Sequence, residues 1–260
     1  MKNQNQSRNE VFRVLSRYLS DSKGYISTFI DSKEAARFVS FFGNGPLVSF
    51  ERPDSFIKKD NEVLIIEHFA IDGFEEYPNG GSKLAKKEKD LEEAFSGLSE
   101  SPEGIHMTST IGVSSSYSGF LSNVIERFNR HYEQIDCYKQ RLIDNGIADE
   151  NTLFRVCFVM EEVSPLGTLT HDGEYICPVC LAKSNEFLDF FQTKPKVDWI
   201  ISAVLIESLF HPYFAARAEI NSLREHTLDY ANYQFLSGES VYYMQYKIVI
   251  PNEAKDEQQG

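Results

Sequence analysis

The sequence predicts an α/β fold, with a mixed β-sheet core flanked by helices. Strand-like and helix-like runs alternate along the chain, which is the pattern of this class. Val197–Ile206 is a long apolar run of the kind that forms a central strand. A chain of 260 residues, 42% of them hydrophobic, can bury one large core. We therefore expect a single domain over residues 1–260, with a helical insertion at about 83–150.

The first part of the chain predicts two helices ahead of a hairpin. Asn9 can cap a first amphipathic helix. The run Asp31-Ser32-Lys33-Glu34 is typical of a capping box and begins a second helix, which Gly43-Asn44-Gly45-Pro46 ends. Leu47–Phe50 then leads into the hairpin.

The hairpin is predicted by two strand-like runs, Ser55–Lys58 and Val63–Ile71, around a polar cluster. If Asp60-Asn61 form a two-residue loop, counting outward from it sets Asp54 directly opposite Glu67. Facing residues of antiparallel strands have Cβ atoms about 4.5–5.5 Å apart. Two carboxylates at that separation can share one divalent cation.

Two alternatives to this acidic pair remain open. A three-residue loop would shift the pairing by one and set Asp54 against Ile66, which separates the acids. In the other, Asp54 begins a turn after Pro53, and Glu67 is a strand residue that faces solvent.

The later elements complete the expected α/β pattern. We predict helices at Lys83–Phe95, along Leu121–Leu142 as one long helix, and at Phe214–Leu236, with strands at Leu153–Met160 and Val241–Ile250.

The net charge, the lack of long apolar runs and the polar start of the sequence argue against some classes of function. The net charge of −13 argues against broad, non-specific attraction to nucleic acid or an anionic membrane, although a local basic patch or bound metal can offset it. No run has the roughly 18–20 apolar residues of a membrane span, and the polar start is unlike a signal peptide. We expect a soluble cytoplasmic protein; its oligomeric state is not predicted.

The four cysteines are Cys137, Cys157, Cys177 and Cys180. Only the last two form a CxxC pair, so a four-thiolate zinc site would need distant residues to converge. The main interpretation is reduced structural thiols; a metal knuckle or a redox pair before a helix are the alternatives.

The hairpin resembles the core of the PD-(D/E)XK nuclease superfamily. In that family a helix precedes a hairpin with Pro-Asp on one strand and Glu-x-Lys on the other, followed by a helix and a further strand. Here Pro53-Asp54 matches the first motif and Glu67-His68-Phe69 the second, and the resemblance covers roughly residues 31–72. It implies a metal-dependent nuclease that acts on phosphodiester bonds, with Asp54 and Glu67 as catalytic residues and Mg²⁺ ligands.

The second motif departs from the family at one position. Phe69 stands where the family has lysine, and family members often move that lysine to a neighbouring element. Lys83 is the first candidate here, with Lys86 and Lys87 close behind it. If none reaches the site, the chain resembles an inactivated relative.

Further acids and one histidine are weaker candidates. The resemblance offers Glu34 as an additional metal ligand. In the alternative interpretation, Glu34 is the acid of the capping box at the start of its helix. His68 lies on the strand face opposite Glu67, where it can hydrogen-bond a neighbouring acid, ligate a metal or serve as a core residue. Glu161 and Glu162 end a strand and point to opposite faces, so only one of them can approach this edge.

Two functions follow. The first is a metal-dependent, nuclease-like protein with nucleic acid as its partner. The alternative is a catalytically inactive binding or regulatory protein on the same scaffold, which acts through protein contacts.

Overall fold

The computed structural model describes residues 31–43, 45–71, 89–90, 93, 106–113, 117–162, 167–169, 176–206, 209–230 and 240–247. The chain forms two compact units. The first comprises Met1–Gly73 and Tyr117–Phe235, and the second Phe74–Ser116 and Leu236–Gly260. The candidate site belongs to the first unit, which is described first.

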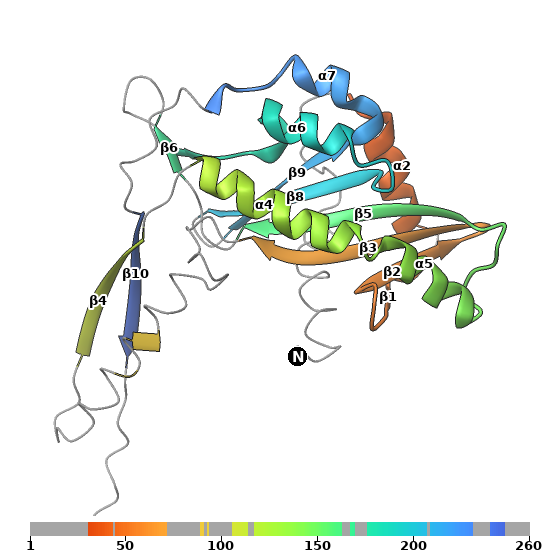
Figure 1. The fold of residues 1–260 in the computed structure, drawn as a ribbon, viewed down its shortest axis with the longest axis horizontal. Coiled ribbons are helices and arrows are strands. Elements are labelled where there is room, and N and C mark those ends of the chain that lie inside the picture. The colour runs from red at the N-terminus through yellow and green to blue at the C-terminus, as the bar shows by residue number, and fades with distance from the viewer. Residues whose placement is uncertain are drawn as a thin grey trace, which may run out of the picture. The chain divides into compact units, whose positions relative to one another are not determined.

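A six-stranded sheet in the order β1-β2-β3-β5-β8-β9 forms the centre of the first unit (Figure 1). Its strands are β1 Val48–Ser49, β2 Ser55–Lys59, β3 Glu62–Ile71, β5 Leu153–Glu162, β8 Trp199–Ile206 and β9 Leu209–Ala216. The first three pair antiparallel, β3, β5 and β8 pair parallel, and β9 returns antiparallel to β8. The sheet is mixed and flanked by helices, which confirms the predicted fold class.

The central strands are apolar because both faces of the sheet are covered. β3 is buried along almost its whole length, and so is the second half of β5. Parallel pairing of β3 with β5 needs a crossover that packs on the sheet, which the helical segment between them supplies.

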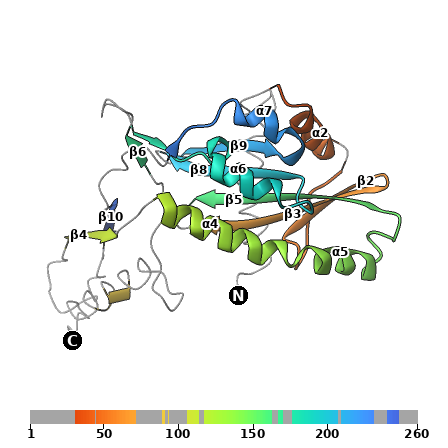
Figure 2. The same cartoon turned by 45° about the horizontal axis from the view of Figure 1, so that its top comes forward.

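Helices cover both faces (Figures 1 and 2). They are α2 Lys33–Phe42, α4 Tyr117–Tyr132, α5 Ile135–Asp144, α6 Asn185–Gln192 and α7 Ile220–Arg224, with short 3₁₀ turns at Leu181–Lys183 and Arg217–Glu219. Buried residues of α4 to α7 share one core with one sheet face, while α2 packs on the other. We call these the α4 face and the α2 face.

Strand alternation assigns the residues of β3 to these two faces. Val63, Ile65 and Phe69 belong to the core of the α4 face, whereas Leu64 and Ile66 belong to the core of the α2 face. Because side chains alternate along a strand, Glu67 points to the α4 face and His68 to the α2 face.

Two predicted helices are wrong in part. The long helix is interrupted, since α4 ends at Tyr132 and α5 begins at Ile135. The helix predicted at 214–236 begins instead as the end of β9, and only short helical turns follow up to Arg224. Its alanines favour helix, but pairing with β8 decides the conformation.

The remaining strands pair in two small sheets. In the second unit β4, His106–Val113, pairs antiparallel with β10, Ser240–Lys247, which agrees with the strand predicted there. Gly167–Leu169 (β6) pairs with Ile176–Pro178 (β7).

The predicted insertion at 83–150 is divided between the two units, because α4 and α5 belong to the first. Most of the helix predicted at 83–95 lies outside the described residues.

Candidate functional site

The hairpin has the register that brings the two acids together. β2 ends at Lys59 and β3 begins at Glu62, with Asp60 in the left-handed region at φ 51°. Ser55 pairs with Ile66, so Asp54 lies one residue beyond the end of β2, opposite Glu67. The backbone N–H of Asp54 donates to Glu67 Oε2 at 3.2 Å. The predicted two-residue loop is confirmed, and the three-residue alternative is excluded.

Asp54 is a half-buried acid beside a second acid. Its Oδ2 accepts a hydrogen bond from the backbone N–H of His68 at 2.8 Å. Burial, followed by the charge of Glu67, raises the pKa of Asp54 to about 6, although the hydrogen bond from His68 acts against this rise. Asp54 thus changes protonation near neutral pH.

Glu67 is buried, with 6% of its surface exposed, and two groups of the helical layer contact it. The hydroxyl of Tyr138, from α5, donates to Glu67 Oε1 at 2.8 Å. His131 Nδ1, from the end of α4, lies 2.8 Å from the same oxygen. Burial, then the charge of Glu67, raises the pKa of Tyr138, so its hydroxyl remains a donor.

Phe69, at the position of the family's lysine, supports His131 instead of supplying a charge. The two rings stack with centroids 4.4 Å apart and an interplanar angle of 9°. Phe69 and Glu67 are two residues apart on β3 and therefore share the α4 face. The nitrogen-bearing side chain that contacts Glu67 is thus a histidine from a helix, and not a lysine of the strand.

His68 lies on the α2 face, as predicted, and pairs with Glu161 of β5. Its Nε2 is 3.0 Å from Glu161 Oε2, and both side chains are buried. β3 and β5 run parallel there, with Ala70 opposite Glu161. Of the three possibilities for His68, the structure shows a buried side chain that forms a hydrogen bond with a neighbouring acid. Glu162 points to the opposite face from Glu161.

The structure does not bring Glu34 to the acidic pair. Its Oε2 accepts a hydrogen bond from the indole of Trp199 at 2.9 Å, on the α2 face. Ser32 caps α2 by accepting from the backbone N–H of Ala35, so Glu34 does not act as the capping acid. The sheet separates Glu34 from Glu67. Lys83 lies outside the described residues.

Cys180 is a buried thiol whose burial raises the pKa to about 12, as expected of a structural cysteine. The side chain of Cys177 lies outside the described residues, so the CxxC pair stays a prediction.

The acidic pair fits a divalent cation held with water and substrate oxygens. A carboxylate has about four acceptor positions, and Glu67 uses three while Asp54 uses one. Mg²⁺ typically binds through one or two carboxylates plus water and phosphate oxygens. Within the described residues, no group of three or more His, Cys, Asp and Glu side chains forms a metal site. Among the described residues, Asp54 and Glu67 are the two that could hold a cation at this place.

His131 and Tyr138 were not predicted, although the sequence carries a signal for both. They lie seven residues apart, and buried apolar residues Val124, Phe128, Ile135 and Leu142 continue the same helical spacing. Two polar side chains in an apolar stripe need a buried partner, and Glu67 supplies it.

Comparisons with protein families, curated proteins and solved structures find no match to this chain. No helix in the described part of the chain has the length and apolar character of a membrane span.

Proposed function

We propose that this protein is a metal-dependent, nuclease-like hydrolase of phosphodiester bonds, similar to the PD-(D/E)XK superfamily. The observation that carries the proposal is the placement of Asp54 against Glu67 at the end of the hairpin. The order of elements supports it as well. Helix α2 precedes the hairpin, and helices α4 and α5 connect it to the parallel strand β5.

The arrangement of charge is typical of a functional site because it lowers stability. Two carboxylates in partial burial repel one another, and burial and this repulsion raise the pKa of Asp54 to about 6. A divalent cation between them would remove the repulsion, activate a water for attack on phosphorus and offset charge on the phosphate. Asp54 and Glu67 are the residues that would hold it.

His131 takes the place of the missing lysine in this proposal. When Glu67 is ionised it can only accept, so Nδ1 of His131 carries the hydrogen directed at Oε1. The other nitrogen, Nε2, is then available to hold or release a proton. The imidazole is 25% exposed, and stacking on Phe69 fixes its plane. A histidine in this position can move a proton to or from the reacting phosphate.

Cleavage assays with Mg²⁺ and Mn²⁺ test the proposal on plasmid DNA, single-stranded DNA and RNA. We expect the wild type to cleave at least one substrate, and Asp54→Asn and Glu67→Gln to lose about 100-fold or more. Glu34→Gln is the matched control, since Glu34 lies on the other side of the sheet and should leave the rate unchanged. No cleavage by the wild type with either metal, or full activity of Asp54→Asn, would contradict the proposal.

The second candidate is a catalytically inactive binding or regulatory protein on the same scaffold. Phe69 at the lysine position favours it, as do the three hydrogen bonds that Glu67 already accepts. Such a protein acts through protein contacts and should bind its partner equally well after Asp54→Asn and Glu67→Gln.

A further inference from the structure

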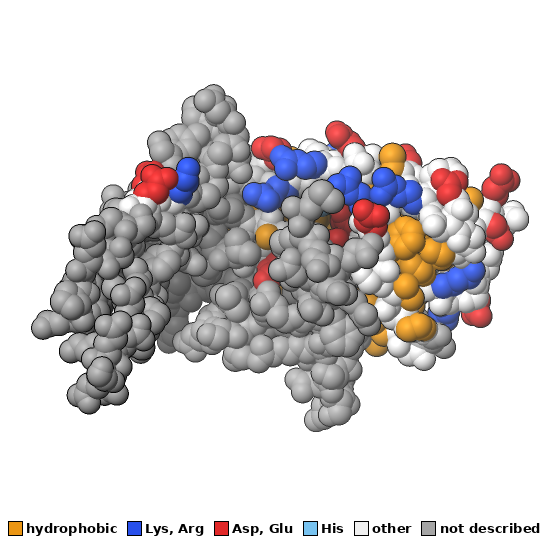
Figure 3. Space-filling view, turned by 90° about the horizontal axis from the view of Figure 1, so that it is seen from below, with side chains coloured by type: hydrophobic (Ala, Val, Ile, Leu, Met, Phe, Trp, Pro, Cys, Tyr) orange, Lys and Arg blue, Asp and Glu red, His pale blue; other side chains and the backbone are white. Residues whose placement is uncertain are grey.

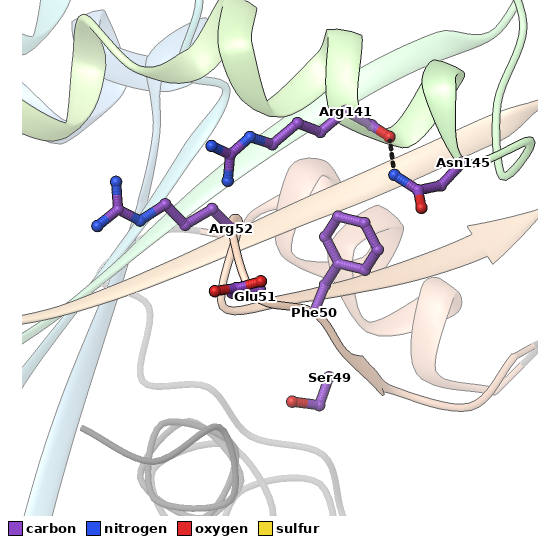
Figure 4. A pocket seen from close by; sticks show the side chains of 6 residues that line it. All are labelled: Ser49, Phe50, Glu51, Arg52, Arg141 and Asn145. Carbon is purple, nitrogen blue, oxygen red and sulfur yellow. Dashed lines mark hydrogen bonds between the residues drawn. The ribbon is translucent and has the colours of Figure 1, made fainter. Parts of the chain in front are cut away.

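A polar cavity lies on the first unit, lined by residues 49–52 and by the C-terminal end of α5. Its volume is about 510 Å³, and Ser49, Phe50, Glu51, Arg52, Arg141 and Asn145 line it. Arg52 belongs to the loop between β1 and β2, and Arg141 to α5. Figure 4 shows the two side chains extending in the same direction from these two elements, with Asn145 bonded to the carbonyl of Arg141.

Both arginines of the cavity lack a protein partner within the described residues. Each is exposed, and neither guanidinium forms an ion pair or hydrogen bond there, not even with Glu51 beside Arg52. Four other arginines of the unit are paired with acids: Arg37 with Glu62, Arg130 with Glu126, Arg155 with Asp198 and Arg224 with Asp189. Two unpaired guanidinium groups around one cavity form a site for an anion.

Both arginines of the cavity lie on elements that also carry residues of the candidate site. Arg52 is two residues from Asp54, in a loop closed by a hydrogen bond from the N–H of Phe50 to the carbonyl of Asp54 at 3.1 Å. Arg141 follows Tyr138 by three residues on α5, which places them on neighbouring positions of one helix face. The charge of Arg52 also acts on the hydroxyl of Tyr138, which donates to Glu67. The two arginines therefore belong to the same loop as Asp54 and to the same helix as Tyr138.

The charge around the cavity suits a phosphate better than a cation. Glu51 is the single acid among the lining residues, against two arginines. Although the net charge of the sequence is −13, Figure 3 shows Lys and Arg side chains in a row on one face, interspersed with Asp and Glu side chains.

We infer that Arg52 and Arg141 form a phosphate-binding subsite, which holds the backbone of a polynucleotide strand beside Asp54 and Glu67. The inference rests on the proposed function for its substrate class. Arginine binds phosphate through paired N–H donors, and the two guanidinium groups supply them from independent elements. The subsite positions the strand and carries no base specificity.

The subsite can be tested without any cleavage by measuring the affinity for a fluorescein-labelled, single-stranded oligonucleotide 20-mer. Binding is monitored by fluorescence anisotropy in the presence of EDTA. We expect Arg52→Gln and Arg141→Gln each to weaken binding about tenfold, and the double variant more. The dependence of affinity on salt should also flatten, by about 0.7 in the logarithmic slope per arginine removed. Arg130→Gln is the matched control, because Arg130 is an exposed arginine outside the cavity that pairs with Glu126.

The outcomes separate this inference from the proposed function. If Asp54→Asn loses cleavage but binds the 20-mer as the wild type does, the result supports both the nuclease function and the phosphate subsite. If the wild type binds the 20-mer through the two arginines but never cleaves, only the nuclease function is overturned. Equal binding by the wild type and the double variant overturns the subsite, and so does a wild type that neither binds the 20-mer nor is protected against heat by inorganic phosphate. Protection of the wild type against heat by inorganic phosphate, without affinity for the 20-mer, would overturn the polynucleotide assignment.

Discussion

Replacing Asp54 with asparagine should stabilise the protein at neutral pH. Asn keeps a carbonyl oxygen that can accept from the N–H of His68, and the backbone N–H that bonds Glu67 is unchanged. The negative charge is lost, and with it the cost of its burial and its repulsion by Glu67, which together outweigh its attraction to neighbouring groups. Removal of an acid from a functional site commonly raises stability in this way.

The size of the effect follows from the pKa of Asp54, which is 3.8 in its ordinary state and about 6 in the folded protein. At 1.36 kcal/mol for each pKa unit this difference corresponds to about 3 kcal/mol. Because Asp54 is half-buried and partly screened by water, we expect about 1 to 3 kcal/mol. A carboxyl with a raised folded pKa contributes stability in full below its ordinary pKa and loses it as pH rises through about 6.

Urea unfolding of the wild type and Asp54→Asn from pH 3.5 to pH 7.5 measures this directly. The gain in stability of the variant over the wild type should grow between about pH 4 and pH 6.5 and then level off. Asp60→Asn, at an exposed acid of the same hairpin that already tolerates positive φ, is the matched control and should change stability little. A difference that stays constant with pH, or that falls as pH rises, would show that the charge of Asp54 does not destabilise the folded protein.

Two further substitutions test the packing that holds the site. Tyr138→Phe removes the hydroxyl that donates to Glu67, and we expect a loss of about 1 to 3 kcal/mol in urea unfolding at pH 7; an unchanged midpoint would argue against that bond. Phe128→Ala removes a fully buried ring that packs against Phe158, with 4.8 Å between the two ring centroids. We expect it to lower the free energy of unfolding by about 3 to 5 kcal/mol in the same assay. Leu153→Ala, at a residue 46% exposed, is its control and should cost below about 0.5 kcal/mol; equal losses would contradict the assignment of the core.

The hairpin was predictable because its determinants are local. Asp60 and Asn61 form the loop, and the register of every pair up to Asp54 follows from the loop length. The fold class was predictable for a similar reason, since apolar runs such as Val197–Ile206 indicate buried strands. Such signals lie within short windows of sequence.

The rest of the site depends on tertiary packing, which no short window contains. His131 reaches Glu67 only because α4 crosses the sheet on the face to which Glu67 points. Glu34 shows the converse, since its helix packs on the other face and its carboxylate bonds Trp199. The resemblance to the nuclease superfamily gave Glu34 as a candidate ligand, but its helix covers the face of the sheet opposite to Glu67.

Whether Asp54 and Glu67 together bind a divalent cation can be measured by calorimetric titration with Mn²⁺ at pH 7.5. We expect saturable binding to the wild type, unchanged binding to Glu34→Gln, and loss of binding in Asp54→Asn and Glu67→Gln, both folded by circular dichroism. No saturable binding to the wild type, or equal binding to Asp54→Asn, would contradict it.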